Sequence, residues 1–226
     1  MSETMGRIEI PEYKLWDIES IAQDFLNRHW DPAQHPVDIE MIVEDSLGML
    51  IEVTEVEGFT VLGSICRRKS DGRFVIVVDE STFNRRYKIY RFTLAQEVSH
   101  FLLHRELLDA IRTVDDANHF RESLTEQQYR YLESDANRCA GAILMPQRAF
   151  CVVAHESYER WCKKVLQTGV GLSTSARFIQ DHVVADLASA FDVNPKPARI
   201  RLQNHPIKLY KRIADSAARG LSYIAE

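Results

Sequence analysis

A strongly apolar stretch of the sequence carries a few polar side chains that could do chemistry. Residues 89–108 include eleven apolar or aromatic side chains, so a helix over this stretch must be buried. The amide, carboxylate and imidazole groups that could do chemistry here belong to Gln96, Glu97, His100 and His104. At 100° per residue these four fall within about a quarter of the helix circumference. Burying a carboxylate and imidazoles costs on the order of several kcal/mol unless they are paired, hydrogen-bonded or bound to a cation. The pattern therefore indicates either an internally satisfied polar cluster or a site.

The order of these polar residues is one substitution away from a metal-binding motif. Residues 96–100 read QEVSH, where the motif HExxH would begin with histidine. In HExxH, two histidines at i and i+4 bind one metal ion, and the glutamate takes a proton from the metal-bound water. A neutral amide is a poor zinc ligand compared with imidazole. The segment by itself is weak evidence for a metal site and needs support from elsewhere in the chain.

A carboxylate on a second expected helix could supply that support. Glu133 shares its helix face with Asn137, and the small residues Ala136, Ala140 and Gly141 lie on either side of it. Small residues let another backbone approach closely, which a glutamate needs in order to reach an ion held by a neighbouring helix. Spacing alone does not distinguish this arrangement from a glutamate in a surface ion pair.

Two segments, taken in order, resemble the ImmA/IrrE family of metallo-endopeptidases. Residues 91–104 read RFTLAQEVSHFLLH and residues 133–146 read ESDANRCAGAILMP, where the family usually has RFTLAHELGHFLLH and ExEANRFAAELLMP. The resemblance covers most of residues 14–150. It implies an α+β fold with a zincin-like metallopeptidase core and a small antiparallel sheet over residues 1–150. Residues 151–226 would then form a mostly helical C-terminal region.

The resemblance also implies a gluzincin-like site for one Zn²⁺ ion. His100 corresponds to the second histidine ligand, Glu133 to the carboxylate ligand and Glu97 to the general base. Asn137 would orient a ligand or the helix contact, as residues behind metal ligands often do. His104 is common in the family without being a ligand, so we expect it to make a structural hydrogen bond.

Gln96 is the departure from the family pattern. It reduces three strong protein ligands to two and a weak one, so we expect zinc to bind weakly or not at all. An alternative ligand set of His100, His104 and Glu133 is allowed by the spacing. In that set Phe101 would stand where the proton acceptor belongs. Either the natural protein has weakened or lost catalysis, or Gln96 is an engineered change that inactivates it.

The elements that must position these residues follow from the hydrophobic pattern. Asp71-Gly72 is a hairpin signal between the second and third extended runs, and residues 115–123 read as a polar connection. We expect strands over residues 49–56, 60–66 and 73–79. We expect helices over residues 16–30, 36–48, 85–108, 124–144, 149–167 and 173–191.

The C-terminal segment is the only basic region of note. Residues 193–226 carry seven basic and two acidic residues, although the whole chain has a net charge of −5. A helix ending near residue 191, a short turn and a restart at Asn194-Pro195 form a helix-turn-helix pattern. DNA contact through this second helix is disfavoured by the acidic remainder of the molecule. Its candidate DNA-binding residues are Lys196, Arg199 and Arg201.

The remaining composition is that of an ordinary globular protein. No apolar run approaches the roughly 20 residues that span a bilayer. The N-terminus also lacks the apolar stretch of a signal peptide, so we expect a cytoplasmic protein without a membrane partner. The four cysteines lie far apart without a CxxC pair, which favours packing roles over disulfides or a zinc knuckle.

Three functions are consistent with these features. The first is a zinc endopeptidase regulator whose substrate is a DNA-binding repressor of the helix-turn-helix type, with catalysis weakened or lost through Gln96. The second is a pseudopeptidase that binds its partner, a repressor or a toxin, without cutting it. The third is a DNA-binding module that uses residues 184–212.

Overall fold

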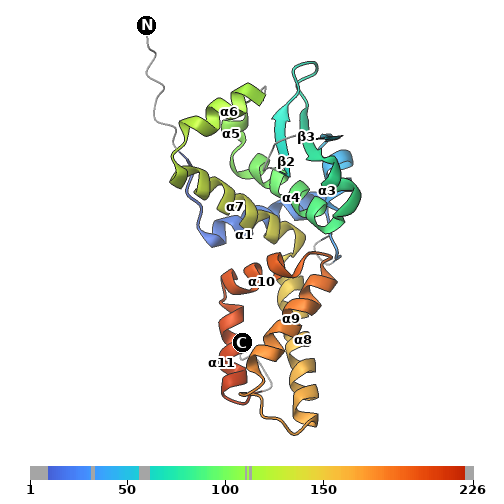
Figure 1. The fold of residues 1–226 in the computed structure, drawn as a ribbon, viewed down its shortest axis with the longest axis vertical. Helices are drawn as coiled ribbons and strands as arrows, with labels where there is room; N and C mark the ends of the chain where they lie inside the picture. The colour runs from blue at the N-terminus through green and yellow to red at the C-terminus, as the bar shows by residue number, and fades with distance from the viewer. Residues whose placement is uncertain (1–9, 32–33, 56–61, 110, 112–113, 222–226) are drawn as a thin grey trace. The chain divides into compact units, whose positions relative to one another are not determined.

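The computed structural model describes residues 10–31, 34–55, 62–109, 111 and 114–221. The chain divides into two compact units. The first comprises residues 1–21 and 39–140, and the second comprises residues 22–38 and 141–226. Two helices, α1 (Leu15–His29) and α7 (Glu126–Leu144), contribute to both units (Figure 1). The domains expected from the sequence, 1–150 and 151–226, remain a proposal.

The first unit contains a three-stranded mixed sheet. Its strands β1 (Leu50–Thr54), β2 (Gly63–Arg67) and β3 (Phe74–Asp79) lie in the order β1-β3-β2. β2 pairs antiparallel with β3, with Ile65 opposite Ile76, but β1 pairs parallel with β3. The expectation of an antiparallel sheet is therefore wrong for β1. β3 is apolar and buried along most of its length, which suits a central strand, whereas β1 and β2 are more exposed and form the edges.

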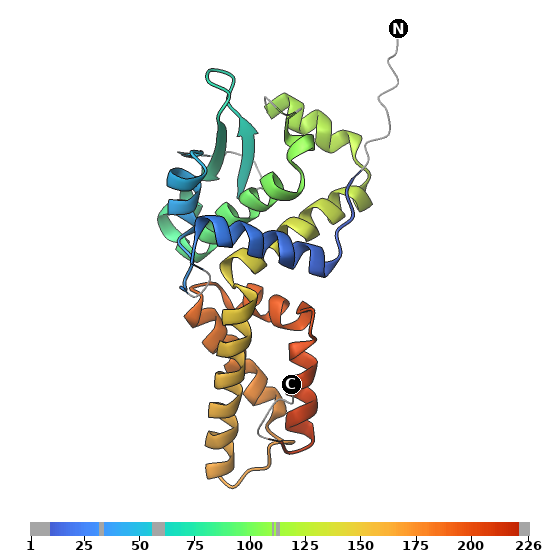
Figure 2. The same ribbon diagram turned by 180° about the vertical axis from the view of Figure 1, so that it is seen from behind.

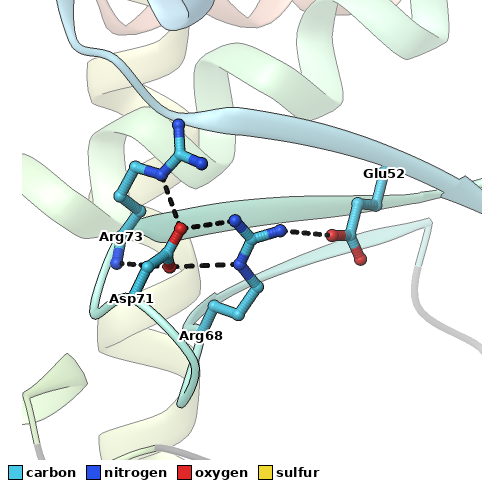
Figure 3. Close-up of polar contacts among 4 residues, drawn as sticks. All are labelled: Glu52, Arg68, Asp71 and Arg73. Carbon is cyan, nitrogen blue, oxygen red and sulfur yellow. Dashed lines mark hydrogen bonds and ion pairs between the residues drawn. The ribbon is translucent and has the colours of Figure 1, made fainter.

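A network of charged side chains fixes the hairpin between β2 and β3. Gly72 adopts a positive φ of 72°, which confirms the turn expected at Asp71-Gly72. The Asp71 carboxylate accepts hydrogen bonds from Arg68 and Arg73, and Arg68 also lies 3.6 Å from Glu52 of β1 (Figure 3). These hydrogen bonds hold the pKa of Asp71 well below its ordinary value. Because the groups are largely in solvent, the network defines the turn more than it stabilises the fold.

The helices of the first unit divide more finely than the sequence suggests. The expected helix over residues 85–108 is interrupted at Arg86 and at His104, whose φ of −128° and ψ of 24° lie outside the helical region. The expected polar connection is itself helical, with the basic Arg121 in its last turn. Besides α1 and α7, the helices of this unit are α2 (Ile39–Met41), η1 (Ile42–Ser46), α3 (Glu80–Arg85), α4 (Tyr87–Leu103), α5 (Arg105–Leu108) and α6 (Val114–Ser123).

α4 is the central helix of the first unit. It contacts β2, β3, α2 and α3, and Tyr90, Leu94, Ala95 and Val98 are completely buried. Gly63 of β2 lies against this helix, because a Cβ at this glycine would come within 2.4 Å of the Thr93 side chain. The sheet edge and α4 therefore approach more closely than any larger residue would allow.

The second unit consists of helices packed around an aromatic and aliphatic core. α8 (Gln147–Gln167) and α9 (Ala176–Ala190) lie side by side, and α10 (Pro195–Asn204) and α11 (Leu209–Ala218) pack against α9 (Figure 2). The restart at Asn194-Pro195 is confirmed, since Asn194 is extended and Pro195 opens α10. The largest completely buried side chains here include Tyr158, Phe150 and Phe191. The sequence reading had not assigned α11.

Two further findings bear on expectations from the sequence. Across the residues described, no helix is both long enough and apolar enough to cross a membrane. All four cysteines are free thiols, and Cys139 and Cys162 are buried, as expected for packing residues.

Candidate functional site

The first unit brings together Gln96 and His100 of α4 and Glu133 of α7. Gln96 Nε2 donates a hydrogen bond to Glu133 Oε2 over 2.9 Å. His100 Nε2 lies 3.6 Å from the other carboxylate oxygen, Glu133 Oε1. One carboxylate from α7 is therefore held between an amide and an imidazole, both from α4. The side chains that follow Glu133 on its own helix, Ala136 and Ala140, are small and completely buried.

Two residues that the sequence reading missed also act on the Glu133 carboxylate. Burial raises the pKa of Glu133, while the positive charge of Arg121 and hydrogen bonds from Gln96 and Tyr129 oppose that rise. Tyr129 stands four residues before Glu133 on α7, which is the spacing at which helical side chains meet, so it could have been found from the sequence. Arg121 belongs to α6, the segment that the sequence analysis read as a loop.

Glu97 lies beside this cluster but is engaged by the sheet. Its side chain is buried, with 6% of the residue exposed, and its carboxylate accepts a hydrogen bond from the backbone N–H of Ile65 in β2. Burial and the negative charge of Glu133 raise the pKa of Glu97 to about 8, with the Ile65 hydrogen bond opposing them. Glu97 is therefore mostly protonated at neutral pH.

His100 and His104 contact each other through the same type of ring nitrogen. Their Nδ1 atoms lie 3.2 Å apart. Burial lowers the pKa of His104 to about 4, and burial together with the neighbouring His104 lowers the pKa of His100 to about 3. Both imidazoles are therefore neutral at neutral pH, and the contact between His100 and Glu133 is not an ion pair. The hydrogen bond expected for His104 is the one to His100.

The hydrogen-bond pattern assigns a tautomer to each ring. A neutral imidazole has one N–H group, and the acidic neighbour of His100 Nε2 favours the N–H at that position. His100 Nδ1 then accepts a hydrogen bond, so His104 carries its proton on Nδ1. His104 Nε2 is buried and has no hydrogen-bond partner among the described atoms, as suits an unprotonated nitrogen. Binding a metal through His100 Nε2 would require the opposite arrangement in both rings.

The donor set does not fit a three-ligand zinc site. Such a site needs three lone pairs directed at one point about 2.0–2.2 Å away. Gln96 instead directs an N–H donor at Glu133, and His104 contacts the edge of His100 opposite the one that faces Glu133. Among the described residues, no three His, Cys, Asp or Glu side chains are placed to hold a metal ion. The alternative set of His100, His104 and Glu133 is therefore not assembled.

Asn137 lies next to the cluster but contacts the helix rather than a ligand. Its Nδ2 donates to the main-chain carbonyl oxygen of Glu133 over 2.7 Å, and its side chain is exposed. This bond steadies the turn of α7 that carries Glu133. It does not reach the carboxylate.

The three basic residues considered for DNA contact differ in burial and in their partners. Arg201 is buried, and its Nε donates to the carbonyl oxygen of Met145 over 2.8 Å. Arg199 pairs with Asp181 over 2.8 Å, and Lys196 is exposed. Arg201 is therefore part of the second unit's interior, and the geometry gives no support to a DNA surface on α10.

Comparison with known proteins places the chain in a family. The family model described as the IrrE N-terminal-like domain, a peptidase family, matches residues 47–202, which is more than half of the chain. No curated protein matches. Among solved structures, a Mycobacterium tuberculosis transcriptional regulator is similar at 16% identity and a TM-score of 0.48, over 85% of this chain and 48% of that one. This chain thus spans about half the length of that protein. The resemblance seen in the two sequence segments is confirmed, and the chain belongs to the peptidase family of the IrrE N-terminal-like domain.

Proposed function

We propose that this protein is a regulator with a metallopeptidase fold that binds its protein partner and has lost, or nearly lost, the ability to cleave it. The observation that carries the proposal is the 2.9 Å hydrogen bond from Gln96 Nε2 to Glu133 Oε2. This bond joins two positions that in an intact zinc site would both be ligands of the same ion. The amide of Gln96 takes over the contact that the ion would provide.

The electrostatics of the cluster support this proposal. Peptide hydrolysis at a zinc site uses the charge of the ion to polarise the carbonyl group and to acidify the attacking water. Without that cation, Glu97 has its pKa raised to about 8 and His100 has its pKa lowered to about 3. The amide N–H of Gln96 is directed at Glu133, so position 96 offers no lone pair to a cation at this point.

The family resemblance supports a repressor as the partner. In the ImmA/IrrE family the substrate is a DNA-binding repressor of the helix-turn-helix type, and we propose that this chain retains that recognition. A toxin is the alternative partner for a binding protein of this kind. Weak zinc-dependent peptidase activity is the alternative to a complete loss of catalysis.

A reconstitution experiment tests both parts of the proposal. The chain is incubated with each of a panel of purified helix-turn-helix repressors, with and without zinc, and examined by size-exclusion chromatography and intact-protein mass spectrometry. We expect a complex in which the repressor stays whole. Zinc-dependent cleavage by the unaltered chain would refute the proposal if Glu97→Gln abolished that cleavage. Gln96→His with zinc is the positive control, and the pair Gln96→His with Glu97→Gln is its matched inactive variant.

A further inference from the structure

A thiol and an imidazole meet in the second unit, separately from the cluster described above. Cys151 Sγ of α8 lies 3.7 Å from Nε2 of His205, the residue that follows α10. Cys151 forms no disulfide and is of intermediate exposure, whereas only 3% of His205 is exposed. The thiol therefore belongs to a residue that is partly open to solvent, and the imidazole beside it is held inside the protein.

Aromatic packing fixes the orientation of the imidazole. The ring of His205 stacks on Phe150, with centroids 5.6 Å apart and planes at 9°. The buried guanidinium of Arg201 lies 5.3 Å from the centre of the same Phe150 ring and is itself held by the Met145 carbonyl oxygen. His205 thus cannot turn its ring without disturbing the stack, and a positive charge lies in the same neighbourhood.

A base held against a thiol is the arrangement that makes cysteine nucleophilic. The thiolate, not the thiol, is the reactive form, and an adjacent imidazole or cationic side chain favours it. We propose that Cys151 is a reactive thiol, activated by His205, which hydrogen peroxide oxidises to a sulfenic acid.

The step balances without any further reactant. The Cys151 thiol gives its proton to Nε2 of His205, and the thiolate sulfur attacks one oxygen of hydrogen peroxide. An S–O bond forms while the O–O bond breaks, so the sulfur is oxidised and the peroxide is reduced. The departing hydroxide takes the proton from the imidazolium, and the products are a sulfenic acid and one water. The added oxygen then lies between α8 and the end of α10, where His205 now packs.

The chain contains its own control for this reactivity. Cys66 of β2 is also a free thiol of intermediate exposure, but burial and the negative charge of Glu52 raise its pKa. The native full chain is treated with iodoacetamide over a range of pH values, and alkylation of each cysteine is followed by peptide mass spectrometry. At neutral pH we expect Cys151 to react on the order of ten-fold faster than Cys66, because the adjacent imidazole favours the Cys151 thiolate, whereas burial and the negative charge of Glu52 raise the pKa of Cys66. Equal rates would overturn the proposal.

A substitution of the base separates activation from simple exposure. His205→Phe keeps an aromatic ring to stack on Phe150 but removes the nitrogen that faces the sulfur. We expect this variant to slow alkylation of Cys151 about ten-fold and to leave Cys66 unchanged. An unchanged Cys151 rate in a folded variant would contradict the role of His205. If the variant does not fold, the pH profile of the unaltered chain decides, since activation requires the Cys151 profile to begin at lower pH than that of Cys66. Trapping with dimedone after peroxide treatment must label Cys151 and not Cys151→Ser, and a lack of label on Cys151 refutes the oxidation step.

Discussion

The hydrogen bond between Gln96 and Glu133 should be measurable as a coupling free energy. We consider Gln96→Leu, which removes the donor while keeping a side chain of similar length. A hydrogen bond to a charged group contributes about 1.5–3 kcal/mol to stability. The Glu133 side chain is 32% exposed and its pKa is raised by burial, so the lower end of that range, about 1.5 kcal/mol, is the appropriate estimate. For a chain of this size the loss corresponds to a fall in Tm of about 3–6 °C.

A double-mutant cycle with Glu133→Leu isolates this term from the loss of the glutamine itself. Urea unfolding followed by circular dichroism gives the free energy of unfolding for the four proteins. Gln96→Leu should cost about 1.5 kcal/mol in the unaltered background and close to zero when Glu133 is already leucine. The same cost in both backgrounds would show that the bond does not hold α4 to α7. The reasoning also requires that a chelator leave the unfolding of the unaltered chain unchanged, because a fall in stability would reveal a bound metal.

Further predictions concern the site and the second unit. The Gln96→His variant should gain about 2.7 kcal/mol of stability when the zinc concentration is about a hundred times the variant's Kd for zinc. Scanning fluorimetry should show this gain as a rise in Tm of about 5–10 °C. The unaltered chain should show no rise. Because the pKa of Glu97 is raised to about 8, the folded state keeps a proton that the unfolded state has lost. Stability should therefore fall as pH rises from the ordinary carboxyl value towards about 8, and Glu97→Gln should remove this fall in urea titrations at several pH values. The pKa of His104 is lowered to about 4, so the unfolded state binds a proton that the folded state does not. Stability should thus drop as pH falls from about 6.5 to about 4, and His104→Phe should lessen the drop. Asp186 accepts hydrogen bonds from a serine, an arginine and a tryptophan of α8. Asp186→Ala should therefore lower the free energy of unfolding in urea by about 2 kcal/mol. A loss below about 0.5 kcal/mol would contradict the role of Asp186 in joining α8 to α9.

The residues that share a face within each central helix could be predicted because these relations depend on helical periodicity. Helical spacing placed Gln96 and His100 on one side of α4, and the structure has both facing Glu133. It also placed Glu133 beside small residues of α7, and Ala136 and Ala140 are indeed buried there. These relations follow from 3.6 residues per turn and need no knowledge of the tertiary structure.

Features that depend on pairing between distant segments could not be predicted in this way. The parallel pairing of β1 with β3 follows from which strand occupies the centre of the sheet, and the hairpin signal at Asp71-Gly72 says nothing about β1. The hydrogen bond from Ile65 to Glu97 uses a backbone N–H, which any residue type would supply. Gly63 was the available signal, since a glycine within a strand often marks the close approach of another element.

The burial of Arg201 changes the interpretation of its charge. The sequence pattern places Arg201 among basic residues that could face DNA, but its guanidinium is inside the second unit, where it donates to the Met145 carbonyl oxygen and lies 5.3 Å from the centre of the Phe150 ring. Arginine can be buried when its donors are satisfied and its planar group is stacked, so charge along a helix does not by itself identify a solvent-facing surface. Helical periodicity does not predict this burial, because Met145, the hydrogen-bond partner of Arg201, lies 56 residues earlier in the chain.

The chemistry of glutamine explains how residue 96 can contact Glu133 without a metal ion between them. An imidazole that binds zinc directs a lone pair at the ion, and so does the carboxylate opposite it, so in a zinc site the cation holds the two side chains together. Glutamine carries an N–H donor as well as an acceptor oxygen, and Glu133 selects the donor. The substitution at residue 96 therefore exchanges a contact that requires a metal for one that requires none. In this chain the hydrogen bond from Gln96 to Glu133 joins α4 to α7 without an ion.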